Sequence, residues 1–134
     1  MVSRSIDWIR QARRNLASAH ANYEKELYEE SCFESHQAGE KAVKGLLNYL
    51  HRERRGHSIT FLLLDTGIEV PRDIRECALM LDKHYVPSRY PDVYDEGAPM
   101  DYYTGRDAEE CIRCAELILK WVEEVVGRAQ RASS

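Results

Sequence analysis

The residues best suited to chemistry lie between Tyr85 and Tyr103. The sequence around the start of this segment is HYVPSRYPDVY, from His84 to Tyr94. The segment holds five of the eight tyrosines and three of the four prolines of the chain. Prolines restrict the backbone on both sides of Arg89, and a guanidinium held among tyrosine rings suits a phosphate or a carboxylate. The candidate ligand-binding residues of this loop are Tyr85, Arg89, Tyr90 and Asp92.

A structural interpretation of the same loop is equally open. Arg89 could tie the loop down through an internal carboxylate, such as Asp92 or Asp95, with the tyrosines serving as packing. A long connection in a compact domain usually has a function or is disordered, and the aromatic content argues against disorder.

A second group of polar residues follows one face of the segment from 27 to 52. His36 and Glu40 continue a line of apolar residues spaced by three and four positions, and lysines flank it. Polar groups on the shoulder of an apolar stripe either reach water or line a groove. Glu40, Lys41 and Lys44 are therefore further candidate ligand-binding residues. Alternatively, Glu40 and Lys44 form an ordinary surface ion pair worth only ~0.2–0.5 kcal/mol.

Charge is unevenly distributed along the chain. The net charge is -4 at pH 7, which argues against a surface built throughout for nucleic acid, so we expect no DNA partner. The stretch HRERRGH from His51 to His57 is nevertheless rich in arginine and leaves a local basic patch possible.

The cysteines do not have the spacing of a metal site. Cys111 and Cys114 form a CIRC pair, but neither a second pair nor a suitably spaced histidine accompanies them. We therefore expect the four cysteines to act as small, mostly buried apolar residues that need not pair, and we expect no metal and no cofactor.

Apolar residues recur with helical spacing along nearly the whole sequence, and no segment alternates as a half-buried strand does. The prediction is an all-α, antiparallel up-and-down bundle of four long helices plus one short connecting helix. Long helices are expected at 5–26 and 27–52, after Pro71, and from a Thr104–Asp107 capping pair onward. The short helix should follow Ser58 as its N-cap and end at Gly67, and Gly56 should end the second long helix.

The size of the chain, 134 residues, fits one domain over 1–134, with an ordered core at 5–126 and a frayed end at 127–134. No apolar run approaches the ~18–20 residues that span a bilayer, so we expect a cytoplasmic protein with no membrane partner. Small residues on the second helix offer either a dimer face or internal packing. They are Cys32, Ser35, Gly39 and Ala42.

Four stretches together resemble the HEPN domain, the higher eukaryotes and prokaryotes nucleotide-binding domain, in its small stand-alone prokaryotic form. They are WIRQARRNLASAH, YEESCFESHQAGEKAVKGLLNYL, GHSITFLL and LDKHYVPSRYPD, in that order along the chain. The resemblance implies a helical bundle that forms a homodimer, and a minimal nucleotidyltransferase as its partner in a two-component system resembling toxin and antitoxin.

Many HEPN domains are also metal-independent ribonucleases, which use an arginine and a histidine with four to six other residues between them, near the start of the last long helix. Here Arg106 and Arg113 lack such a histidine, and after Arg89 the corresponding residue is Tyr94. Tyrosine, with a pKa near ~10, exchanges protons poorly at neutral pH. Pairs with the right spacing occur elsewhere, at Arg52 and His57 and at Arg14 and His20.

Two hypotheses follow. In the first, the chain is a HEPN module that binds a nucleotide or a protein partner through Arg89 and its neighbours, without cleaving RNA. In the second, it is a ribonuclease toxin in which Arg89 contacts the scissile phosphate and His84 or His57 moves the proton.

Overall fold

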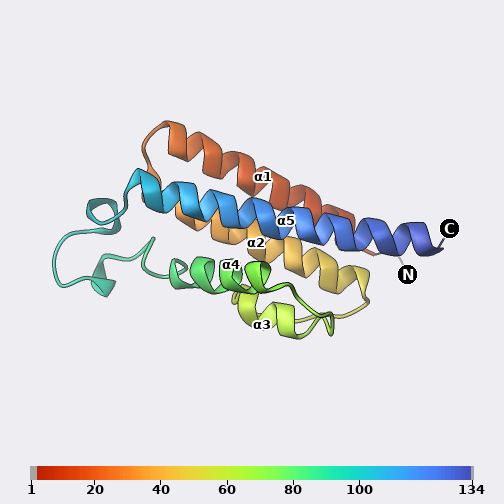
Figure 1. Cartoon of the computed structure of the whole chain (residues 1–134). Helices are drawn as coiled ribbons and strands as arrows, with labels where there is room; N and C mark the ends of the chain where they lie inside the picture. Colours follow the sequence, from red (N-terminus) through yellow and green to blue (C-terminus); the bar gives the residue numbers. More distant parts are fainter. Residues whose placement is uncertain (1–2, 134) are drawn as a thin grey trace.

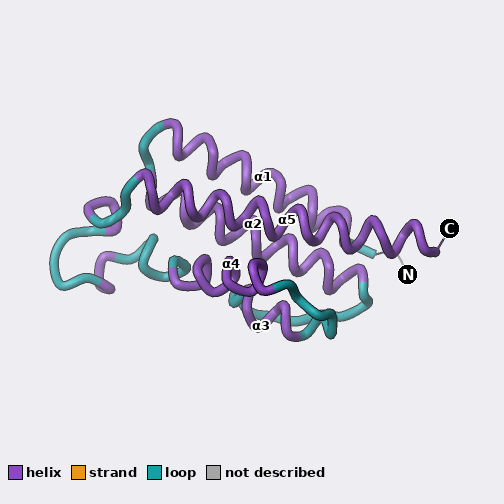
Figure 2. Tube along the Cα trace, viewed as in Figure 1, coloured by secondary structure: helices purple, strands orange, loops and turns teal. Residues whose placement is uncertain are grey.

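The computed structural model describes residues 3–133, and this part of the chain is helical with no strand (Figures 1 and 2). The α-helices are α1 (Ser5–Glu24), α2 (Tyr28–Tyr49), α3 (Ile59–Leu64), α4 (Arg72–Lys83) and α5 (Gly105–Ser133). Two single-turn 3₁₀ helices, η1 (Pro91–Val93) and η2 (Pro99–Asp101), lie in the loop between α4 and α5. The all-α prediction of four longer helices and one short helix is confirmed.

The four longer helices run alternately up and down, and the short α3 packs against α4 and α2 (Figure 1). Helix α2 is central, because it packs against α1, α3, α4 and α5. The loop between α4 and α5 projects from the end of the bundle opposite the chain termini (Figure 2). The candidate residues at the beginning of that loop therefore lie beside the C-terminal end of α4.

Both α1 and α2 end in a Schellman motif without a glycine. After α1, Glu26 has a φ of 61°, and the Leu27 N–H donates to the Asn22 carbonyl over 2.8 Å. After α2, His51 has a φ of 59°, and the Arg52 N–H donates to the Leu47 carbonyl over 2.8 Å. The second helix thus ends at Tyr49 and not near Gly56, since the chain turns at His51.

Both predicted N-terminal caps are present. The Ser58 hydroxyl accepts a hydrogen bond from the Phe61 N–H at the start of α3. At the start of α5, the Thr104 N–H donates to Asp107, and the Asp107 N–H donates to the Thr104 hydroxyl. This reciprocal arrangement is a capping box.

The line of small residues on α2 is core and not a dimer face. Cys32, Ser35 and Ala42 have no exposed surface, and Gly39 is buried among side chains of three other helices. A Cβ added at Gly39 would lie 2.8 Å from Cδ1 of Ile59. The small side chains therefore let α3, α4 and α5 approach α2, and they no longer support dimerisation.

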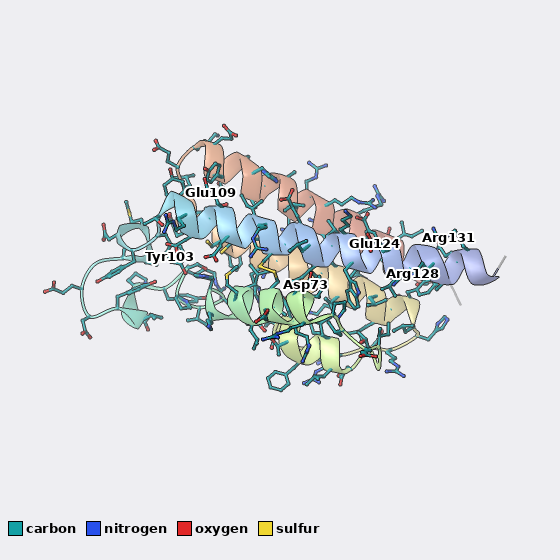
Figure 3. All side chains as sticks on the ribbon, viewed as in Figure 1. Asp73, Tyr103, Glu109, Glu124, Arg128 and Arg131 are labelled. Atoms are coloured by element: carbon teal, nitrogen blue, oxygen red, sulfur yellow. A yellow bond between two sulfur atoms is a disulfide. The ribbon has the colours of Figure 1, made fainter. Side chains whose placement is uncertain are left out.

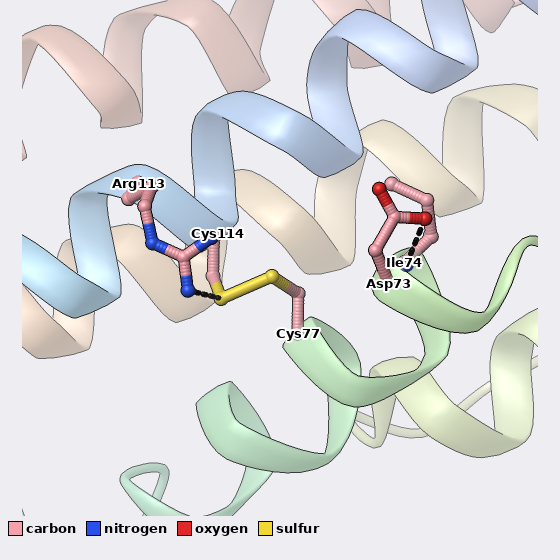
Figure 4. Close-up of a disulfide and its surroundings, with 5 residues drawn as sticks. All are labelled: Asp73, Ile74, Cys77, Arg113 and Cys114. Carbon is pink, nitrogen blue, oxygen red and sulfur yellow. Dashed lines mark hydrogen bonds between the residues drawn. A yellow bond between two sulfur atoms is a disulfide. The ribbon is translucent and has the colours of Figure 1, made fainter.

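The sequence provides no reason for the cysteines to pair, but two of the four do. Cys77 of α4 and Cys114 of α5 form a disulfide, with 5.0 Å between their Cα atoms (Figure 4). Sequence spacing does not indicate this pair, because 37 positions separate the two cysteines and only helix packing brings them together. Cys32 and Cys111 are free thiols and are buried, as expected.

Helix α5 continues beyond residue 126 to Ser133. Gly127 does not end it, because the following Arg, Ala and Gln residues favour helix and Val126 is still buried. Fraying of these last turns in solution stays a prediction. Within residues 3–133, no helix is both long and apolar enough to cross a membrane.

Candidate anion-binding site

The guanidinium of Arg89 lies among three aromatic rings. Its Cζ atom is 4.3 Å from the ring centroid of Tyr85, and 4.8 Å from each of the ring centroids of Phe33 and Tyr90. The Nε–H donates to the Tyr85 carbonyl over 2.8 Å, and Nη1 donates to the Tyr90 hydroxyl over 3.4 Å. The rings orient the guanidinium and attract its charge without neutralising it.

No carboxylate within residues 3–133 lies within 4 Å of the Arg89 guanidinium. The structural interpretation, in which Asp92 or Asp95 ties Arg89 down, is therefore wrong. Asp92 instead lies exposed on η1. Arg89 is only partly buried, and the N–H donors that it does not use internally are available to an anionic group.

Tyr85 connects the loop to the polar face of α2. Its ring stacks on His57, with 5.1 Å between centroids and 22° between planes, and it lies 4.7 Å from the ring of His36. The Arg89 guanidinium also contacts this ring, so Arg89 and His57 share one neighbour. The two groups of candidate residues found in the sequence thus meet at Tyr85.

Glu40 is a buried carboxylate with two basic neighbours. Its Oε2 accepts a hydrogen bond from Lys44 over 2.9 Å, and its Oε1 lies 3.2 Å from Nδ1 of His57. The Glu40 side chain is 5% exposed, whereas the His57 side chain is 57% exposed. Because Glu40 is buried, its pair with Lys44 is more than a surface ion pair, and Glu40 also orients His57 from inside the bundle.

A groove of about 1000 Å³ opens beside His57 and Lys44. Its walls come from the start of α1, the end of α2 and the segment from Arg52 to His57. Five of the lining residues are Lys or Arg and two are Asp or Glu, so the groove is basic although the chain as a whole is acidic. We call it the basic groove; its cations are Arg4, Lys44, Arg52, Arg54 and Arg55.

Two cations of the basic groove also hold its wall in place. Arg52 donates to the Asp65 carbonyl over 2.7 Å, and Arg54 pairs with the Asp65 carboxylate over 2.8 Å. These contacts fasten the basic segment to the end of α3. Trp8 of α1 faces the same groove, with Nζ of Lys44 5.7 Å from its ring centroid. An aromatic face beside cations is suited to a nucleobase and its phosphates.

Asp82 of α4 differs from Arg89, because its charge is satisfied by hydrogen bonds inside the protein. Its carboxylate accepts hydrogen bonds from the Ile59 and Thr60 N–H groups, from the Ser58 and Thr60 hydroxyls, and lies 3.0 Å from Nε2 of His36. Burial by itself raises the pKa of Asp82, but hydrogen bonds from His36 and the start of α3 lower it to about 2. Asp82 therefore anchors α3 to α4.

His36 lies between these two sites and has no exposed surface. Its Nε2 faces Asp82, while its Nδ1 has no hydrogen-bond partner and lies 4.0 Å from Oε1 of Glu40. The imidazole therefore contacts the anchoring carboxylate of α4 and lies next to the carboxylate that orients His57.

Two predicted site residues lie elsewhere. The Lys41 ammonium donates to Asn15 over 2.9 Å at the interface of α1 and α2, outside the basic groove. His84 contacts Tyr103, with 2.7 Å between Nδ1 and the hydroxyl, and burial lowers the pKa of His84. Of these two histidines, His57 stacks on the Tyr85 ring that Arg89 also contacts, whereas the ring of His84 faces Tyr103.

Two residues of the site were not recognised in the sequence, Phe33 and Trp8. Phe33 precedes His36 by three positions on α2, so the helical spacing that selected His36 and Glu40 could have been extended to it. Trp8 lies among the apolar residues of α1 in the sequence. Its proximity to the basic segment depends on the antiparallel pairing of α1 and α2, which local spacing does not specify.

The fold and site define a small helical-bundle protein with a basic groove and an arginine that has no carboxylate partner within residues 3–133. The HEPN domain profile matches residues 5–125. The chain therefore belongs to the HEPN domain family, as the resemblance of the sequence implied.

Solved structures agree with this assignment. The chain is 54% identical to ST0689, an archaeal HEPN homologue, covering 93% of this chain and 99% of that one with a TM-score of 0.81. It is 42% identical to TT1696 from Thermus thermophilus, covering 92% and 98% of the two chains, with a TM-score of 0.89. A protein of Methanocaldococcus jannaschii named "Putative toxin MJ1304" is 30% identical over 87% of this chain and 84% of its own length.

Proposed function

We propose that this HEPN protein binds a nucleotide, with Arg89 receiving a phosphate and the basic groove accommodating the rest of the ligand. The observation that carries the proposal is the Arg89 guanidinium, held at Tyr85 by aromatic rings and its own backbone with no carboxylate partner. An oriented, unneutralised guanidinium is suited to bidentate contact with phosphate. Tyr90 and Lys44 are the neighbouring ligand-binding residues.

The proposal extends to biological context. The toxin name of the Methanocaldococcus jannaschii relative and the HEPN assignment support a toxin-like module. We propose that the chain works in the cytoplasm as a homodimer and as one half of a two-component system with a minimal nucleotidyltransferase. A nucleotide held at Arg89 would be the chemical link between the two components.

Calorimetric titration with nucleoside triphosphates tests the binding proposal. Arg89→Ala should weaken affinity by about tenfold or more, because a charge-assisted hydrogen bond contributes ~1.5–3 kcal/mol. Arg128→Ala is the matched control, since Arg128 is an exposed arginine that does not line the groove, and it lies at the opposite end of the bundle from the loop that carries Arg89 (Figure 3). Equal affinity in wild type and Arg89→Ala would refute the role of Arg89.

The alternative is a metal-independent ribonuclease, and the pair of His57 and Glu40 is the observation that favours it. A histidine oriented by a buried carboxylate beside a basic groove is a suitable general base for the RNA 2′-hydroxyl. Arg89 would then contact the scissile phosphate. Tyr85 would separate the two groups, because each contacts its ring.

Incubation of purified protein with RNA in the presence of a metal chelator separates the two functions. Binding without cleavage predicts intact RNA for wild type, Arg89→Ala and His57→Ala alike. Chelator-resistant cleavage that is lost in His57→Ala and Arg89→Ala, but kept in Arg128→Ala, would establish the ribonuclease. Light scattering on the same samples tests the homodimer, and co-purification with the nucleotidyltransferase tests the partner.

A further inference from the structure

Three potential metal ligands come together where α2, the end of α4 and α5 meet. The thiols of Cys32 on α2 and Cys111 on α5, and one ring nitrogen of His84 at the end of α4, all lie within 4.8 Å of one another. Both cysteines are fully buried and neither is in the disulfide. Their spacing in the sequence hides the cluster, because each ligand comes from a different helix.

We propose that Cys32, His84 and Cys111 form a zinc-binding site. Two thiolates and an imidazole are ligands that Zn²⁺ prefers, and three protein ligands with one open position is an established zinc arrangement. The proposal reverses the expectation from sequence that the chain has no metal site. On binding, each thiol releases its proton to solvent and its sulfur ligates the ion.

The geometry requires only a small adjustment. Ligand atoms around a tetrahedral zinc ion lie about 3.3–3.8 Å apart, since Zn–S is ≈ 2.3 Å and Zn–N is ≈ 2.0–2.1 Å. The three atoms must therefore approach one another by about 1 Å, which a modest change of side-chain torsions can provide. Cys32 and Cys111 lie within helices and His84 is the C-cap of α4, so helix packing holds the cluster in place.

Tyr103 supplies the contact that orients the histidine. Its hydroxyl lies 2.7 Å from Nδ1 of His84, which leaves Nε2 as the nitrogen for the metal. A ligating histidine commonly uses its second ring nitrogen in this way, which fixes the tautomer and the ring orientation. Tyr103 closes the loop just before α5 (Figure 3), so a metal held here would join the two ends of the loop that carries Arg89.

Metal uptake by the reduced full-length protein is the first test. The protein is reduced with a phosphine, equilibrated with zinc sulfate, desalted and analysed for zinc and free thiols. We expect about one zinc per chain in wild type and in Cys77→Ala/Cys114→Ala, which keeps only the two thiols of the cluster. Cobalt should give a thiolate-to-metal charge-transfer band in both proteins. No uptake with both thiols free would overturn the site.

Ligand variants then test the assignment. Cys32→Ser, Cys111→Ser and His84→Asn should each lower zinc affinity by about 100-fold or more, and Tyr103→Phe, which changes only the orienting contact, by about tenfold. Circular dichroism establishes that each variant is folded. Unchanged affinity in the folded ligand variants would place the metal elsewhere. If the serine variants do not fold, loss of the charge-transfer band in His84→Asn carries the test.

Discussion

Asp82 and Arg89 are separated by only seven positions, yet the surroundings of their charged groups are opposite in kind. The Asp82 carboxylate faces hydrogen-bonding groups from Ser58, Ile59, Thr60 and His36. The Arg89 guanidinium has aromatic rings around it and no carboxylate within 4 Å in residues 3–133. A charge that is satisfied internally stabilises the fold, whereas a charge that is oriented and left unpaired is available to a ligand.

Replacement of Asp82 should have the largest effect on stability. Asp82→Ala removes the acceptor for the first N–H groups of α3, and we expect a loss of about 2–4 kcal/mol in the free energy of unfolding. Urea denaturation measures it. Asp92→Ala, which removes an exposed carboxylate from the loop, is the control and should change stability by less than about 0.5 kcal/mol. If Asp82→Ala lowered the free energy of unfolding by less than about 0.5 kcal/mol, Asp82 would not be an internally satisfied, stabilising charge.

The contribution of the Asp82 carboxylate to stability should also appear in the pH dependence of unfolding. The pKa of Asp82 is about 2 in the folded protein, against an ordinary value of 3.8. A lowered folded pKa gives stability that is present above pH ~4 and is lost as the pH falls toward ~2, and the difference amounts to about 2 kcal/mol. Unfolding measured from pH 5 to pH 2 should therefore show a shallower loss in Asp82→Asn. Parallel profiles for the two proteins would assign the acid sensitivity to other groups.

Arg89 should show the reverse pattern, with a large effect on binding and a small effect on stability. Arg89→Lys keeps the charge but loses the planar fork and its stacking on Tyr85, so we expect nucleotide affinity to fall by about five- to tenfold. The free energy of unfolding should change by less than about 1 kcal/mol, because no ion pair is broken. Titration calorimetry and urea denaturation on one preparation measure both quantities. A large destabilisation would mean that Arg89 is structural after all.

The smallest change in stability is expected for Glu26, a position at which backbone conformation and not charge or ligand binding is decisive. Glu26 has a φ of 61° in the turn between α1 and α2, a conformation that glycine adopts more readily. Glu26→Gly should therefore stabilise the protein by about 0.5–1 kcal/mol, as measured by thermal unfolding. Glu30→Gly, inside α2, should have the opposite sign. If both variants lose stability equally, relief of backbone strain is not the cause.

Sequence reasoning found the loop residues of the candidate site but not how they are arranged. Arg89, Tyr85 and Tyr90 were selected together because they are neighbours along the chain, and the structure places them in contact. Lys41 and Lys44 both flank the line of His36 and Glu40 in the sequence, but the two lysines face different neighbours on α2. A difference of three helical positions was enough to assign one of them to the wrong surface.

Local sequence was enough to specify the helices, their caps at Ser58 and Thr104, and membership of the HEPN family. The helices and their caps depend on local periodicity and on hydrogen bonds between residues three or four apart, and the family membership was indicated by the resemblance of four stretches to the HEPN domain. Tertiary packing alone established that Cys77 pairs with Cys114, that Cys32 and Cys111 meet His84, and that Arg89 has no internal carboxylate. Each of these features depends on which faces of distant helices pack together, and the local spacing of residues does not specify that packing.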